Sequence, residues 1–157
     1  MDVVGIGIVA GVLGTLVMDS LNILFARTGL ISKIDVETIG RMAAGWVRGR
    51  FRYRDPSEMK PVANERLYGF FAHYTIGIGL ALGYVLGWNV LVGGPVSPLW
   101  ALAYGVATTV ASLFLVYPSM GFGACGRGSP EGLRAPLSSL ANHLFYGTGL
   151  AVGVALM

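Results

Sequence analysis

Four long stretches almost free of charged side chains constrain this chain more than any other feature. They cover residues 3–25, 67–92, 99–117 and 137–157, and Asp19 is the one charged residue within them. Each stretch can cross a hydrocarbon core of about 30 Å as a helix that rises about 1.5 Å per residue. Membrane β-barrels match poorly, because their strands of about 10 residues alternate between apolar and polar side chains. We therefore predict an all-α fold, a four-helix transmembrane bundle that forms a single integral membrane domain over residues 1–157.

The composition agrees with this class of protein. Only 12% of the residues are charged and the mean hydropathy is +0.66, whereas about a quarter of the residues of a soluble domain are charged. A chain this apolar is not expected to be disordered. Its single cysteine excludes a framework of disulfides.

The cations indicate how the spans are oriented. Nine of the eleven Lys and Arg residues lie in the loop 26–66, between the first two spans, and the others are Arg127 and Arg134. The loop 93–98 has none. Because basic loops stay in the cytoplasm, we predict that both basic loops are cytoplasmic and that both termini are outside.

The long basic loop has structure of its own. Apolar residues recur at helical spacing over residues 35–47, which predicts a short helix at the membrane interface. Cations then alternate with aromatic residues at Arg48, Arg50, Arg52 and Arg54. Such a segment suits anionic lipid headgroups, at about 1 kcal/mol per cation. Nothing else supports nucleic acid as a partner, and the simpler alternative is a surface anchor that sets the topology.

The second and fourth spans resemble each other. Residues 73–83 and 143–153 share a histidine, three glycines, a leucine and an alanine at a constant offset of 70 positions. The first and third spans match more weakly, through Gly11 and Thr15 against Gly105 and Thr109. We interpret the chain as two helical hairpins inserted in the same direction, a parallel repeat about an axis along the membrane normal.

Three ionisable residues within the spans are the first candidates for function, because such groups are costly in a membrane. Asp19, His73 and His143 each lie six residues from the cytoplasmic end of their span, a depth of about 9 Å. Asn22 and Asn142 lie near the same level. We expect these five residues to form a polar site that faces the cytoplasm.

Several chemistries fit this set. Two imidazoles and a carboxylate could hold a divalent metal ion, and the two histidines could ligate a haem. Asp19 and the histidines could instead relay protons or line a path for a small solute. The simplest alternative is that each polar group only joins two helices, at about 0.6 kcal/mol per bond.

The chain resembles a family of small bacterial inner-membrane proteins known as domain of unknown function 2938. The resemblance covers nearly the whole chain, and its more specific elements are Glu65-Arg66, His73-Tyr74, Met120-Gly121-x-Gly123, His143 and Gly147-x-Gly149. It implies a four-helix protein of the cell inner membrane and no established activity. In that pattern a glycine usually precedes the Glu-Arg pair, where this chain has Asn64.

Three classes of function follow from these residues. We rank a transport-like or proton- and ion-handling protein first, and an accessory or assembly subunit second. A metal- or haem-dependent membrane enzyme comes third, and no cofactor is predicted. The lipid bilayer is the expected partner, and so small a chain is expected to need a homodimer or a larger membrane complex to enclose a pathway. Candidate residues outside the spans are Glu65, Arg66, Met120, Gly121 and Gly123.

Overall fold

A computed structural model describes residues 1–157, and every regular element in it is a helix. The long elements are α1 (Val3–Ala26), α3 (Glu65–Leu91) and α7 (Arg134–Ala155). A fourth long helix, Pro98–Ser119, comprises α4 (Pro98–Ala107), α5 (Thr109–Ala111), a π-helical segment (Ser112–Val116) and α6 (Tyr117–Ser119). Shorter elements are α2 (Val36–Val47) and the 3₁₀ turns Pro56–Glu58 and Ala124–Gly126.

Polar residues set the start of three helices. The carboxylates of Asp2 and Asp35 accept hydrogen bonds from the backbone N–H groups of Gly5 (2.7 Å) and Thr38 (3.0 Å), so they cap α1 and α2. Ser97 precedes α4, and Pro98 occupies its first turn, where a missing N–H costs nothing. The helix ends lie within a few residues of those predicted from the apolar stretches.

Helix α3 begins differently. The residue before it, Asn64, has φ 58° and ψ 27°, the left-handed region that glycine adopts freely and asparagine tolerates best among other residues. This backbone conformation suits the glycine that the resemblance leads us to expect before the Glu-Arg pair, and asparagine can adopt it as well.

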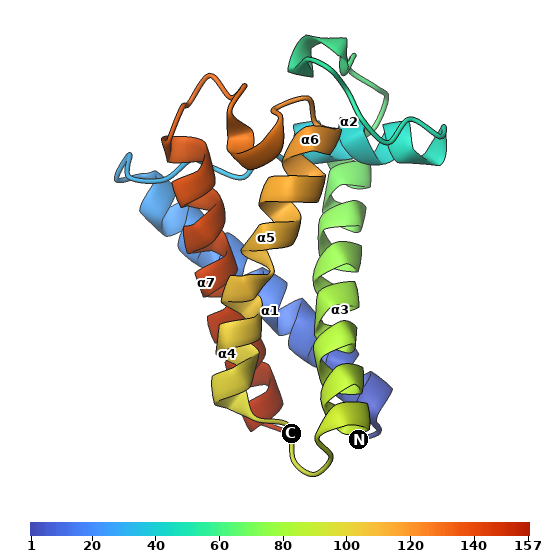
Figure 1. Cartoon of the computed structure of the whole chain (residues 1–157), viewed down its shortest axis with the longest axis vertical. Helices are drawn as coiled ribbons and strands as arrows, with labels where there is room; N and C mark the ends of the chain where they lie inside the picture. The colour runs from blue at the N-terminus through green and yellow to red at the C-terminus, as the bar shows by residue number, and fades with distance from the viewer.

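The long helices approach one another at glycines. A Cβ atom at Gly11 would lie 2.6 Å from the Cα of Ile78 on α3, and one at Gly149 would lie 2.8 Å from the Cα of Gly14. A Cβ at Gly105 on α4 would collide with the backbone of Gly147 on α7. Helix α1 thus packs against α3 and α7, and α7 packs against α4 (Figure 1).

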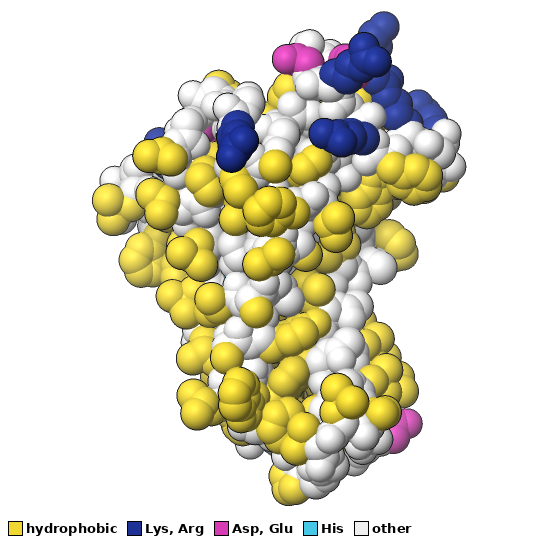
Figure 2. Space-filling model, in the orientation of Figure 1, with side chains coloured by type: hydrophobic (Ala, Val, Ile, Leu, Met, Phe, Trp, Pro, Cys, Tyr) yellow, Lys and Arg dark blue, Asp and Glu magenta, His cyan; other side chains and the backbone are white.

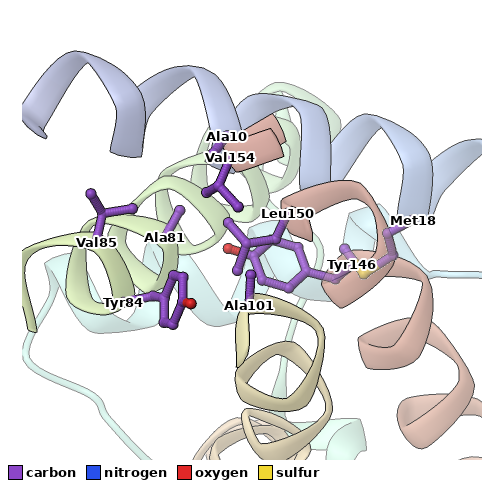
Figure 3. Packing of buried hydrophobic residues seen from close by; sticks show 9 residues of the cluster. All are labelled: Ala10, Met18, Ala81, Tyr84, Val85, Ala101, Tyr146, Leu150 and Val154. Atoms are coloured by element: carbon purple, nitrogen blue, oxygen red, sulfur yellow. The ribbon is translucent and has the colours of Figure 1, made fainter. Parts of the chain in front are cut away.

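One apolar cluster fills the half of the molecule that is away from the basic loops. It brings together side chains of α1, α3, α4 and α7, with Leu150 and Val85 fully buried and Tyr146 1% exposed (Figure 3). This cluster holds nine buried side chains, against four in the cluster of the loops, so it is the main apolar core.

Three helices are long and apolar enough to cross a membrane: α1, α3 and the helix Pro98–Ser119. Figure 2 shows hydrophobic side chains along the sides of the molecule and Lys and Arg gathered at one end. Helix α7 is comparable in length but carries Ser138, Ser139, Asn142 and His143. It packs against both α1 and α4, and Ser138 and Ser139 are buried there.

The short helix α2 lies across the start of α3 at the cation-rich end (Figure 1). A Cβ at Gly40 would collide with the carbonyl oxygen of Glu65, and one at Gly69 with that of Val36. Arg41 donates two hydrogen bonds to the Glu65 carboxylate, at 2.8 and 2.9 Å, and these bonds raise the pKa of the Arg41 guanidinium above its ordinary value.

This crossing generates a stability prediction. Replacing Gly69 by Ala should lower the free energy of unfolding by about 1–3 kcal/mol, because the added methyl forces α2 away from α3. Thermal unfolding of the purified protein in detergent micelles measures the change. Gly79→Ala, on the same helix with no neighbouring atom within 4 Å of its Cβ position, is the control and should be neutral or slightly stabilising. Equal effects of the two substitutions would contradict the close crossing.

Candidate functional site

Asp19 and His73 are in direct contact, as a shared polar site requires. His73 Nε2 lies 2.8 Å from Asp19 Oδ1, and the Tyr74 hydroxyl donates a hydrogen bond of 3.1 Å to Asp19 Oδ2. The side chains of His73 and Asp19 are 12% and 22% exposed. The carboxylate on α1 is therefore held by two consecutive residues of α3.

The hydrogen bonds constrain where protons sit in this group. An ionised carboxylate only accepts, so with Asp19 charged the proton between the two side chains is carried by His73 Nε2. The neutral imidazole then keeps Nδ1 free to accept a further proton.

His143 is oriented by a different partner. Its Nδ1 lies 2.7 Å from the hydroxyl of Thr108, and that hydroxyl donates to the carbonyl of Gly105 at 2.5 Å. Because a threonine hydroxyl has one proton to donate, it accepts from His143 Nδ1–H. The second ring nitrogen, Nε2, is then the free acceptor.

The two asparagines form a third contact. Asn22 Nδ2 donates to Asn142 Oδ1 and to the carbonyl of Ser32, both at 2.9 Å, and its Oδ1 accepts from the N–H of Ile34 at 3.1 Å. Asn22 is 1% exposed. Its hydrogen bonds are all satisfied, so we assign it the structural role of fastening the segment after α1 to α7.

A cavity of about 410 Å³ connects these groups. His73, His143 and Asn142 line it, together with the hydroxyls of Ser112 and Ser139. Exposed residues of the cation-rich end also line it, namely Lys33, Asp35 and Glu131. At the opposite end lies Tyr146, whose hydroxyl donates to the carbonyl of Gly77 at 2.6 Å. The cavity therefore reaches from the basic loops to the apolar core.

One wall of the cavity departs from α-helical geometry. The π-helical segment Ser112–Val116 precedes Pro118, which has no N–H to donate. Ser112 and Val116 line the cavity, and the Ser139 hydroxyl donates to Ser112 Oγ at 2.9 Å. Short π-helical segments occur frequently at functional sites.

The candidate residues separate into three contact groups that share one cavity. Asp19 pairs with His73, whereas His143 is bonded to Thr108. The structure contains no group of three or more His, Cys, Asp or Glu side chains that could hold a metal ion. Metal binding consequently has no geometric support here.

The candidate residues outside the predicted spans lie at the cation-rich end. Glu65 holds Arg41, and Arg66 forms an ion pair with Glu37 at 3.0 Å, so both fasten α2. Met120 belongs to a second buried cluster with Met42, Tyr53 and Met59. Gly121 has φ 84°, and a Cβ there would lie 2.6 Å from the backbone carbon of Asp55.

The four loop arginines Arg48, Arg50, Arg52 and Arg54 are all exposed. Arg50 forms an ion pair with Glu58 and lies over the ring of Tyr53, 4.1 Å from its centroid. Contact of this segment with lipid headgroups stays a prediction.

Sequence reasoning missed the neutral partners of the site. Tyr74 stands in the motif His73-Tyr74 without any sign of its contact, and Thr108 and Ser112 carry no signal, because hydroxyl residues are common in membrane helices. The adjacency of Tyr74 to His73 was a usable signal, since a polar residue beside an intramembrane histidine can reach the same acceptor.

These observations define an all-helical protein with three helices able to cross a membrane and a cavity among its helices that is lined by both apolar and polar side chains. The particular family follows from comparison with family models. Residues 8–157 match the model described as "Protein of unknown function (DUF2938)", and the chain belongs to this family. No curated protein and no solved structure matches the chain.

The contact between Asp19 and His73 generates a second prediction. The free-energy changes of Asp19→Asn and His73→Gln should be non-additive by about 1 kcal/mol or more, because either change alone already breaks the pair. Denaturant unfolding in micelles of the two single variants and the double variant measures this coupling. Asp19→Asn combined with His143→Gln is the control and should be additive within about 0.5 kcal/mol. Additivity in the first pair would mean that the two side chains do not interact.

Proposed function

We propose that this chain is a four-span protein of the cell inner membrane, with both termini outside and α2 at the cytoplasmic interface. Three of the helices are long and apolar enough to cross a membrane. Helix α7 is the proposed fourth, since Ser138, Ser139, Asn142 and His143 line the cavity. Figure 2 supports the orientation, because the cations lie beyond the hydrophobic band at one end.

Glycine contacts support the proposed repeat of two hairpins. Gly11 of α1 meets the backbone of α3 at Gly77 and Ile78, and Gly105 of α4 meets the backbone of α7 at Gly147. Gly11 and Gly105 are equivalent positions in the sequence alignment of the hairpins, and so are Gly77 and Gly147. Each hairpin is thus closed by the same kind of contact at the same place.

Fusion reporters test the topology. Alkaline phosphatase, which is active only outside the cytoplasm, should be active when fused after Met157 and inactive when fused within the loop after Arg54. Green fluorescent protein should give the opposite pattern at the same two positions. The positive-inside distribution is the physical reason. An active phosphatase at the second position would overturn the orientation.

We further propose that the protein takes up protons or small ions at a cytoplasm-facing intramembrane site. The observation that carries this proposal is the placement of His73, bonded to Asp19, on the wall of a cavity that His143 also lines. Each imidazole has one ring nitrogen free of the bonds described above. Serine hydroxyls and Asn142 supply further donors and acceptors on the same walls.

The proposed step moves one proton and balances its charge. A proton enters from the cytoplasmic end and binds the free nitrogen of His73, and the resulting imidazolium is balanced by the Asp19 carboxylate. Passage to the other face requires an opening of the floor, where Tyr146 is bonded to Gly77. The apolar core beneath Tyr146 keeps the two faces separated in the present conformation.

Proton flux into liposomes tests the proposal. Liposomes loaded with the dye pyranine and driven by a potassium gradient with valinomycin should acidify several-fold faster with the wild-type protein than without protein. Asp19→Asn and His73→Gln should each return the rate to that of empty liposomes, because no charged pair is left to accept the proton.

The matched control is Ser20→Ala, next to Asp19 on α1. Ser20 is exposed and its hydroxyl donates only to the carbonyl of Leu16, so this variant should keep the wild-type rate. A wild-type rate equal to that of empty liposomes would contradict proton uptake and transfer.

An accessory subunit is the second candidate, and one observation favours it. Gly79, Gly83 and Gly87 recur every fourth residue of α3, a spacing that lets another helix approach closely. No atom of the chain lies within 4 Å of the Cβ positions of Gly79 and Gly87. This face suits a helix of a second copy or of another subunit.

A further inference from the structure

A second hollow lies at the cation-rich end, outside the proposed intramembrane site. It measures about 640 Å³ and is formed between two loops that are far apart in sequence. Arg52, Tyr53 and Arg54 come from the loop after α2, while Gly121, Phe122 and Gly123 come from the loop after α6. Both loops lie at the same end of the molecule (Figure 1). We call this hollow the arginine–glycine cleft.

Buried packing holds the two walls of the cleft together. Tyr53 and Met120, one from each loop, share a buried cluster and are 8% and 6% exposed. The backbone of Gly121 rests directly on that of Asp55 and Pro56. The walls are therefore fixed by the core of the loops.

The charges on one wall are not compensated. Arg50 is occupied by Glu58 and by the ring of Tyr53, whereas Arg52 and Arg54 form no ion pair in the structure and are exposed. The neighbouring carboxylate of Asp55 accepts from the N–H of Ser57 at 2.8 Å. Two arginines thus line a cleft whose lining residues include no Asp or Glu.

The opposite wall presents backbone. Gly123 has φ 70° and nothing within 4 Å of its Cβ position, so this part of the wall is open. Its N–H donates no hydrogen bond within the protein. Guanidinium groups with a free backbone N–H are the donors that bind phosphate, because each offers hydrogen bonds to its oxygens.

We propose that the arginine–glycine cleft binds a phosphate-bearing anion, held by Arg52 and Arg54 on one side and by the N–H of Gly123 on the other. The volume is in the range of ligand pockets and exceeds what a single phosphate needs. Tyr53 and Phe122 give the cleft two aromatic side chains beside the cations. The phosphate can belong to a soluble compound or to a lipid headgroup. Phe122 lines both this cleft and the intramembrane cavity, but binding of phosphate here does not depend on the proposed proton uptake.

The test uses the full chain in nanodiscs with two probes. Inorganic pyrophosphate is titrated by calorimetry into discs of phosphatidylcholine. In the second arm, native mass spectrometry measures retention of phosphatidylglycerol by protein released from mixed discs. The double variant Arg52→Gln with Arg54→Gln should weaken binding of whichever probe the wild-type protein binds at least about tenfold, because both charge-assisted contacts are lost.

The control removes the same charge from the same loop. Arg48 and Lys60 are exposed, do not line the cleft and form no ion pair, so Arg48→Gln with Lys60→Gln should change binding less than about twofold. Pyrophosphate binding assigns the cleft to soluble phosphates, and retention of phosphatidylglycerol alone assigns it to headgroups. The proposal is overturned if neither probe binds or if both double variants weaken binding equally.

Discussion

Direct contact between helix backbones at glycines is the constraint on which the rest of this structure depends. Gly11 and Gly105 each bring one helix onto the backbone of the next, and Gly149 does so between α1 and α7. In a membrane, helices gain no hydrophobic stabilisation by leaving lipid, so association relies on close packing and on interhelical hydrogen bonds. The glycines provide the close packing, and they bring Asp19 close enough to His73 for an interhelical hydrogen bond.

The cavity follows from an unequal distribution of these contacts. Helices α1 and α7 touch backbone to backbone, whereas α3 and α4 meet through the rings of Tyr84 and Tyr104, whose centroids are 5.2 Å apart. This wider spacing continues toward the basic loops, where α3 and the helix Pro98–Ser119 provide facing walls. Under a strict two-fold repeat, the pair α1 and α7 and the pair α3 and α4 would be equally close. The departure from symmetry leaves room for His73 and His143 on one cavity.

Particular residues show how far the sequence could be read. The apolar stretches predicted the long helices within a few residues, and the spacing in residues 35–47 predicted α2, because periodicity reports burial directly. The contact between Asp19 and His73 was within reach, since both lie at one depth. The role of Asn22 was not, because its partners include the backbone of Ser32 and Ile34, which no side-chain pattern records. The sequence also could not identify the partner of His143. That partner depends on how α4 is rotated about its axis, and the weak amphipathicity of α4 does not specify this rotation.

The sequence by itself determined the class of protein, the lengths of the helices and the segregation of cations to one end, because these depend on local composition and on the cost of charge in an apolar phase. Tertiary structure alone decided that His143 is held by Thr108 rather than by the pair of Asp19 and His73. It also decided that Arg52 and Arg54 face a glycine loop about seventy residues away in the chain. Such pairings depend on how helices rotate and cross, and glycine contacts distributed over three helices set that geometry together.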